Sequence, residues 1–233
     1  DPNLQNIPIR TENGRKVRGM FVPADEDHIL LAADYSQIEL RVIAALAKDE
    51  AMIAAFKAGE DIHKATAAKV FEVPLEEVTR EQRSNAKTVN FGIVYGVSAF
   101  GLSQQTDMSR KEAKAAIDGY FRTYPGIKAY MDEQVSFARE HGYVETITGR
   151  RRYLKDIESR NAVVRGHSER NAVNAPIQGS AADVIKLAMI QVDKAMREAG
   201  MKSKMLLQVH DELVFDAFKE ELGVLKALAV KHM

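Results

Sequence analysis

Short apolar runs of strand length stand out in the alternation of hydrophobic and polar positions. The run within His28–Ser36 predicts a buried strand that ends at Asp34. Two further runs, Met205–Val209 and Leu213–Phe215, flank three polar residues and predict a β-hairpin. The residues at the predicted turn are His210, Asp211 and Glu212.

Longer segments show helical periodicity. The predicted helices cover Ile38–Gly59, 79–96, Ser109–Tyr120, Ile127–His141 and 161–196. The second begins with a capping box, Thr79 and Gln82. Pro125 and Gly126 precede the fourth helix and Gly142 ends it, whereas Pro176 and Gly179 should interrupt the fifth. The segment 142–154 predicts a short hairpin or another short β segment. The pattern as a whole indicates an α-rich protein with a few strands.

Composition excludes several classes of protein. The chain has 233 residues, of which 45% are hydrophobic and 28% charged, as in a soluble globular protein. It has no cysteine, so disulfides and thiolate metal sites are excluded, and any metal must bind oxygen or imidazole ligands. No apolar run approaches the roughly 18 residues of a membrane-spanning helix, and no signal-peptide pattern is present. We therefore expect a cytoplasmic protein without a membrane partner.

Charge is balanced overall but unevenly distributed. Lys and Arg together number 33, as do Asp and Glu. Basic residues nevertheless concentrate between Arg139 and Arg170. Such a run is usually a solvated face, but it could also follow a phosphate backbone.

Two acidic positions suggest metal chemistry. Asp34 ends one predicted strand and Asp211 lies between two others, so only a shared sheet could bring these residues together. Two converging carboxylates could hold two Mg²⁺ ions for displacement at phosphorus. The alternative is two unrelated turn residues, because Asp is common in turns.

The helix predicted at 79–96 carries Arg83, Lys87, Phe91 and Tyr95 at intervals of four residues, on one face. The ordinary interpretation is an amphipathic helix whose aromatic residues pack in a core while the cations reach solvent. The functional interpretation places the cations on a triphosphate and the aromatic residues beside a sugar or base.

Arg170, Asn174 and Gln178 form a similar series on the last predicted helix. Polar helix faces are common, but these long or forked donors would also suit hydrogen-bond acceptors in a minor groove.

Together these segments resemble the palm and fingers of family A DNA polymerases. "DYSQIELR" (Asp34–Arg41) is similar to motif A of that family, "RSNAKTVNFGIVYG" (Arg83–Gly96) to motif B and "QVHDELVF" (Gln208–Phe215) to motif C. "DPNLQNIP", "DIH" and "NAPIQGSAADVIK" also resemble family segments, in the expected order.

The resemblance implies roles for these residues. Asp34 and Asp211 would hold two Mg²⁺ ions, with the backbone carbonyl of Tyr35 as a further ligand and Glu212 just outside the metal ligands. Arg83, Lys87 and His63 would contact the triphosphate, and Lys87 would also be a general acid for pyrophosphate.

The remaining implied contacts concern sugar, template and duplex. Gln37 and Glu39 would line the nucleotide pocket with Glu39 under C2′, Phe91 would lie beside C3′, and Tyr95 would stack at the template position. His210 and Arg170 would contact the primer end. The expected minor-groove contacts are Asn3, Asn6, Asn174 and Gln178. Arg41 is expected to be structural.

The implied fold is α+β, a right-hand polymerase fold with an antiparallel palm sheet and helical fingers. We expect the palm at 1–45 and 160–233 and the fingers at 46–159, with the thumb absent from this chain, which would be a monomeric excerpt. The expected partners are primer–template DNA and deoxynucleoside triphosphates. A non-catalytic nucleic-acid-binding module would have lost Asp34 or Asp211, and a single-subunit RNA polymerase would not favour Glu39 or Phe91.

Overall fold

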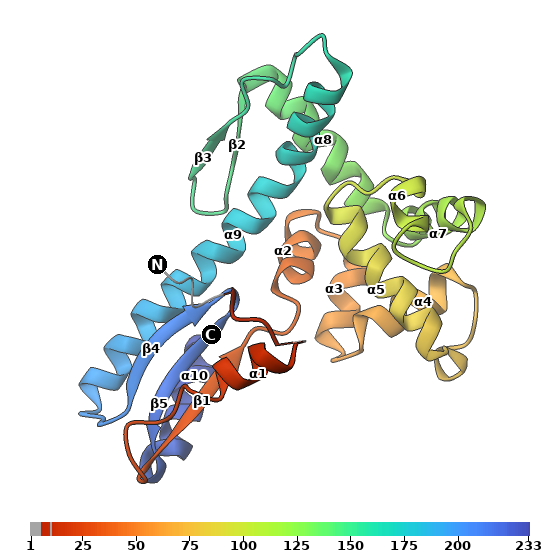
Figure 1. The fold of residues 1–233 in the computed structure, drawn as a ribbon. Coiled ribbons are helices and arrows are strands. Elements are labelled where there is room, and N and C mark those ends of the chain that lie inside the picture. The colour runs from red at the N-terminus through yellow and green to blue at the C-terminus, as the bar shows by residue number, and fades with distance from the viewer. Residues whose placement is uncertain (1–5, 10) are drawn as a thin grey trace. The chain divides into compact units, whose positions relative to one another are not determined.

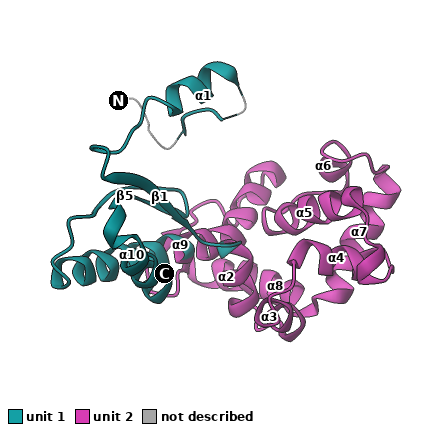
Figure 2. Ribbon diagram, turned by 90° about the horizontal axis from the view of Figure 1, so that it is seen from below, with its two compact units in different colours: residues 1–38, 181–233 teal, residues 39–180 magenta. Residues whose placement is uncertain are grey.

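The computed structural model describes residues 6–9 and 11–233 (Figure 1). Asn3, a predicted minor-groove contact, lies outside these residues. The chain divides into two compact units, residues 1–38 with 181–233 and residues 39–180 (Figure 2). The boundaries of these two units follow from how the chain packs. The predicted division into palm and fingers has different boundaries and stays a prediction.

The first unit is built on a three-stranded antiparallel sheet. Its strands are β1 (His28–Asp34), β4 (Lys204–Val209) and β5 (Glu212–Phe218), in the order β1-β5-β4. The hairpin predicted around Asp211 is confirmed, although Glu212, expected at the turn, is the first residue of β5. The prediction that β1 is buried is wrong, because β1 is an edge strand whose residues are half-buried or exposed, and β5 occupies the centre.

Helices cover the sheet through a separate apolar core. Leu213, Phe215 and Ala217 of β5 pack with Ile185 of α9 (Ala162–Glu198) and Leu225 of α10 (Leu222–His232). The first unit also contains α1 (Glu12–Arg18) and the 3₁₀ turn η3 (Lys219–Glu221). β5 therefore supplies the buried face that holds the sheet in place.

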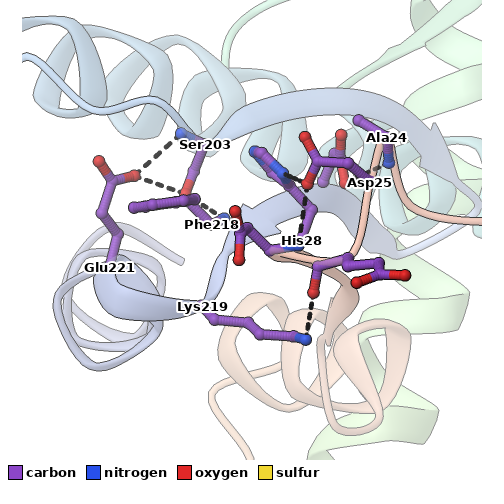
Figure 3. A network of polar contacts seen from close by, with 10 residues as sticks. Ala24, Asp25, His28, Ser203, Phe218, Lys219 and Glu221 are labelled. Atoms are coloured by element: carbon purple, nitrogen blue, oxygen red, sulfur yellow. Dashed lines mark hydrogen bonds and ion pairs between the residues drawn. The ribbon is translucent and has the colours of Figure 1, made fainter.

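A carboxylate anchors the end of the sheet opposite Asp34 (Figure 3). Glu221 accepts hydrogen bonds from the backbone N–H groups of Lys202 and Ser203, both at 2.9 Å, and from the Ser203 hydroxyl at 2.7 Å. The Ser203 hydroxyl in turn accepts from the Phe218 N–H at 2.9 Å. These bonds connect the start of β4 to the end of β5, so both strands of the hairpin are tied at their base.

The second unit is mainly helical. Its helices are α2 (Ile38–Leu46), α3 (Glu50–Lys57), α4 (Ile62–Val70), α5 (Arg80–Val94), α6 (Ala99–Ser103), α7 (Arg110–Thr123), α8 (Pro125–His141) and the first part of α9, with the 3₁₀ turn η2 (Leu75–Glu77). Their shared core includes Leu40, Val89, Tyr120 and Ile177.

The single helix predicted over Ile38–Gly59 is wrong. Lys48 has a φ of +49°, and the buried Asp49 caps α3 by accepting from the Met52 N–H at 3.0 Å. The other Asp49 oxygen accepts from the Gly126 N–H at 3.0 Å. A tertiary partner far along the chain therefore stabilises a break that helical periodicity alone did not reveal.

Other helix ends follow the prediction. The Thr79–Gln82 capping box begins α5, and Gly142 ends α8 in the left-handed conformation at φ +75°. Pro125 is the first residue of α8 rather than a break before it, because proline suits the first helical turn.

The expected interruption of the last helix at Pro176 and Gly179 is also wrong, since α9 runs unbroken through both residues. Neighbouring Val173, Ala175 and Ile177 are buried, and this packing offsets the hydrogen bond that proline cannot donate. The predicted hairpin is confirmed as β2 (Tyr143–Glu145) and β3 (Arg151–Tyr153).

Candidate active site

The sheet of the first unit brings three acidic residues together. Asp34, the last residue of β1, lies opposite Glu212 in the antiparallel register. The next residue, Tyr35, donates its N–H to the Asp211 carbonyl at 3.1 Å. The shared sheet that the sequence required for Asp34 and Asp211 is therefore present.

The charges of these acids oppose one another. The pKa of Asp34 is raised, first by burial, then by the negative charges of Asp211 and Glu212, and by a hydrogen bond with the Asp211 side chain. Each of these causes disfavours the ionised carboxyl. A cation between the carboxylates would remove this repulsion.

Backbone strain lies next to the acids. His210 has a φ of +54°, and Gln37, three residues after Asp34, has a φ of +60°. Such conformations are costly for residues other than glycine and often mark functional sites. Gln208 Nε2 donates to the His210 carbonyl at 2.8 Å, which helps to hold the turn.

Two buried oxygens near these residues have no hydrogen-bond partner in the described part of the chain. They are the Tyr35 hydroxyl and Gln37 Oε1. Buried polar atoms are normally paired, so each such atom is a candidate ligand contact. Burial also raises the pKa of Tyr35, so its hydroxyl stays protonated at neutral pH.

The face of α5 predicted to carry four functional side chains is the one turned away from the core. Arg83, Lys87 and Tyr95 are exposed and Phe91 is half-buried, whereas Ala86, Val89, Asn90, Ile93 and Val94 are buried. This face of α5 packs against the core of the second unit only through Phe91, while Tyr95 is exposed, so the core interpretation holds for one of its two aromatic residues. A pocket of about 480 Å³ lies beside it, lined in part by Lys87, Phe91, Tyr95 and Arg170.

Asp61 organises the cationic end of this face. Its carboxylate accepts from the His63 and Lys64 N–H groups at the start of α4, at 3.0 and 3.1 Å. Its second oxygen forms an ion pair with Arg83 Nε at 2.7 Å. Burial acts to raise the pKa of Asp61, but the hydrogen bond from Arg83 and the backbone donors outweigh it and lower the pKa. The sequence interpretation missed Asp61, although its position before α4 is typical of an N-cap.

His63 is buried, with 1% of its surface accessible. Burial lowers its pKa to about 4; Asp61 opposes this shift, while Arg83 and Lys87 add to it. Its Nε2 atom has no partner among the residues described, while Nδ1 lies 2.9 Å from Asn90 Nδ2. His63 therefore retains one polar atom for a ligand, and its role as a triphosphate contact stays a prediction.

Glu39 and Tyr95 are directly joined. The Tyr95 hydroxyl donates to Glu39 Oε2 at 2.5 Å. Burial and this bond to Glu39 raise the pKa of Tyr95 to about 12, against a smaller lowering by a hydrogen bond with Gln178. Glu39, the predicted sugar contact, and Tyr95, predicted at the template position, are therefore joined by a hydrogen bond.

Arg170, Asn174 and Gln178 share one face of α9, where Arg170 and Gln178 are exposed. Asn174 Oδ1 is a further buried acceptor that pairs with none of the described residues. Asn6 is exposed, and Arg41 stacks over the Phe56 ring, 4.5 Å from its centre; the expected structural role of Arg41 stays a prediction.

Part of the basic segment between Arg139 and Arg170 is neutralised by its own acids. Arg139 pairs with Glu169 and Arg151 with Glu145, both at 2.6 Å. Arg150 donates to the Gly179 carbonyl at 3.1 Å. These contacts favour the interpretation of a solvated, internally paired face for these three residues.

The acids of the first unit suit magnesium. Within residues 6–9 and 11–233, no group of three or more His, Asp or Glu side chains is placed to hold a metal alone. Mg²⁺ requires only one or two carboxylates when substrate phosphates and water complete its ligands. Asp34 and Asp211, whose mutual repulsion a cation would relieve, fit that requirement.

The antiparallel sheet with its paired acids and the helical unit with its cationic face define a polymerase fold. The chain is similar to the solved "POL domain of Pol1 from M. smegmatis complex with DNA primer-template and dNTP", with a TM-score of 0.92 and 50% identity over 99% of this chain and 41% of that one. The family model for DNA polymerase family A matches residues 1–233. The chain belongs to this family.

Two curated relatives show the same similarity along the whole chain. DNA polymerase I of Streptococcus pneumoniae serotype 4 is 58% identical over 234 residues, and DNA polymerase I of Bacillus subtilis is 54% identical over 233. Each match covers 100% of this chain, but 27% and 26% of the relative. The chain thus spans about a quarter of the length of these relatives. In the described residues, no helix is both long and apolar enough to cross a bilayer.

Proposed function

We propose that this chain carries the active site for template-directed DNA synthesis, in which deoxynucleoside triphosphates are added to a primer 3′ end and pyrophosphate is released. The observation that carries the proposal is the meeting of Asp34 and Asp211 on one sheet, where neighbouring negative charges contribute to the raised pKa of Asp34. The similar solved POL domain, which is a complex with primer–template and dNTP, supports the choice of substrates.

Asp34 and Asp211 would hold two Mg²⁺ ions, with the Tyr35 carbonyl as a further ligand and Glu212 outside the ligand set. When bound, such ions lower the pKa of the attacking hydroxyl and neutralise charge on the transferred phosphate and the departing pyrophosphate.

The cations of α5 would bind the triphosphate. The primer 3′-hydroxyl loses its proton to solvent, and its oxygen bonds to the α-phosphorus as the bond from that phosphorus to the β-phosphate bridging oxygen breaks. Pyrophosphate leaves with the electron pair. Arg83 and the Nε2 atom of His63 would hold phosphate oxygens, and the Lys87 ammonium would give a proton to the departing pyrophosphate. Arg83 can do so from its bond to Asp61, because guanidinium has five donors.

The remaining contacts would select the nucleotide and test the base pair. Gln37 and Glu39 would line the pocket, Phe91 would lie beside C3′, and Tyr95 would occupy the template position. His210 and Arg170 would contact the primer end. Minor-groove contacts would come from Asn3, Asn6, Asn174 and Gln178, whose amides suit acceptors that occur at similar places in every base pair. A monomeric state and a cytoplasmic location stay predictions.

Primer extension by the full-length protein tests the proposal. Asp34→Ala and Asp211→Ala should each abolish extension with Mg²⁺ while primer–template affinity changes little. Asp193→Ala is the matched control, since this half-buried acid of α9 lies away from the sheet acids and forms an ion pair with Arg197 at 2.8 Å. Near-normal turnover by either site variant would refute the two-metal role. Retained DNA binding by wild type with no extension under any condition would instead indicate a binding module.

A further inference from the structure

A chain of buried hydrogen bonds ends at His63. Thr66 Oγ1 donates to Asn90 Oδ1 at 3.2 Å and lies 3.0 Å from the Tyr124 hydroxyl. Asn90 Nδ2 then contacts His63 Nδ1 at 2.9 Å. Thr66, Asn90 and Tyr124 are each 0% exposed. Bulk water therefore cannot reach these groups and replace their hydrogen-bond partners.

The direction of each bond follows from the donors available. The single Thr66 proton goes to Asn90, so the Thr66 oxygen must accept from the Tyr124 hydroxyl. Because Asn90 uses its oxygen toward Thr66, its NH₂ group faces His63 and can only donate. His63 Nδ1 must therefore present a lone pair. In the neutral imidazole the proton then resides on Nε2.

The Nε2–H group is left as a buried donor. It has no partner in the structure as described, and the charged groups that act on His63 are Asp61, Arg83 and Lys87. A pKa of about 4 keeps the ring neutral at physiological pH, so only one ring nitrogen carries a proton. The opposite tautomer would direct a lone pair at any phosphate oxygen placed there and would repel it.

We infer that Asn90 is a positioning residue: held by Thr66 and Tyr124, it fixes the His63 tautomer so that Nε2–H is available to the triphosphate together with Arg83 and Lys87. This inference rests on the proposed function, since it assumes that the anionic ligand is the nucleotide. It adds three buried residues that the motifs do not mark as contacts, and that act only through His63.

The first test removes the Thr66 hydroxyl without changing side-chain shape. In Thr66→Val, Asn90 Oδ1 loses its donor, so the amide can turn, accept from Nδ1 and shift the His63 proton away from Nε2. In the full-length protein we expect KM for the nucleotide to rise about tenfold, the effect of one lost contact. The primer–template Kd should not change. Thr66→Ser, which keeps the hydroxyl, should resemble wild type.

A double-mutant cycle separates this role from packing. If Thr66 acts through His63, Thr66→Val should have no further effect on KM in a His63→Ala background. An equal rise in both backgrounds, or no rise in either, would overturn the inference.

Asn90→Asp provides a second readout that does not depend on the first variant folding. An aspartate at this position can only accept, so His63 Nδ1 must donate and the imidazolium form is stabilised. KM should then stay low while His63 is charged and rise as increasing pH removes the Nε2 proton, within about pH 6 to 8. Wild type should show no such step, and a flat profile in Asn90→Asp would contradict the inference.

The Lys87→Ala variant distinguishes failure of the proposed function from failure of the positioning role of Asn90. If it leaves nucleotide KM and kcat unchanged, the triphosphate is not bound at α5 and the proposed function fails. If it impairs nucleotide use while the Thr66 and Asn90 variants behave as packing mutants, only the positioning role of Asn90 is refuted.

Discussion

Tyr95→Phe removes one hydroxyl and tests whether Tyr95 holds Glu39 in place. The hydroxyl donates to Glu39 Oε2 at 2.5 Å, and its pKa of about 12 keeps it protonated at neutral pH. A hydrogen bond to a charged group contributes about 1.5–3 kcal/mol. Because Tyr95 is 39% exposed, water can replace part of this bond, and the lower figure applies. About 1.5 kcal/mol corresponds to roughly a tenfold effect.

We propose that Glu39 excludes the ribose 2′-hydroxyl. A loosely held Glu39 should therefore discriminate less strongly against ribonucleotides. In Tyr95→Phe the preference for deoxyribonucleotides over ribonucleotides should be about tenfold lower than in wild type. Glu39→Ala should lose the whole preference, and the double variant should be no worse than Glu39→Ala. The measurement is kcat/KM for matched ribo- and deoxyribonucleotides on one primer–template.

Two results would refute this reasoning. Full discrimination in Tyr95→Phe, together with its loss in Glu39→Ala, would show that the hydrogen bond does not position the carboxylate. Unchanged discrimination in Glu39→Ala would show that the sugar is selected elsewhere.

Four further outcomes are expected. Lys87→Ala should lower kcat/KM for nucleotides by about 10²- to 10³-fold, because a charged contact in the transition state is lost, and single-turnover extension would detect it. Phe91→Tyr should increase acceptance of dideoxynucleotides by offering a hydroxyl in place of the missing 3′-hydroxyl; terminator incorporation that stays at the wild-type level would contradict this. In chelator, Asp34→Asn should raise the melting temperature at pH 7, because the raised pKa of Asp34 means that ionisation of its carboxyl destabilises the folded state. This gain should shrink as pH falls through the raised pKa and vanish only below the ordinary Asp value of 3.8. Glu221→Gln should lower the free energy of unfolding by about 1 kcal/mol above pH 5. The difference from wild type should be lost as pH falls through the lowered pKa of Glu221, which denaturant titrations at several pH values would show.

Local chemistry predicted much of the fold. The capping box at Thr79, the stop at Gly142 and the hairpin around Asp211 each depend on residues close in sequence, and each is confirmed. The face of α5 was also predicted correctly, because the spacing of four residues determines which side chains lie together.

The errors arose where distant contacts decide the structure. The break before α3 depends on Asp49 accepting a hydrogen bond from Gly126, and the continuity of α9 through Pro176 depends on buried neighbours. The sequence did not indicate that His63 is buried against Asn90, because only the tertiary structure reveals that partner. The roles of the site residues beyond this geometry stay predictions.

The turn between β4 and β5 also limits how this protein can evolve. Val209 pairs with Glu212, so only two residues connect the strands, and one of them is already in a strained conformation. A single insertion or deletion there would move every following side chain of β5 to the opposite face, exposing Phe215 and displacing the acids together. New substrate preferences are therefore expected to arise by substitution on the α5 face, while changes in length accumulate in exposed connections such as 71–79.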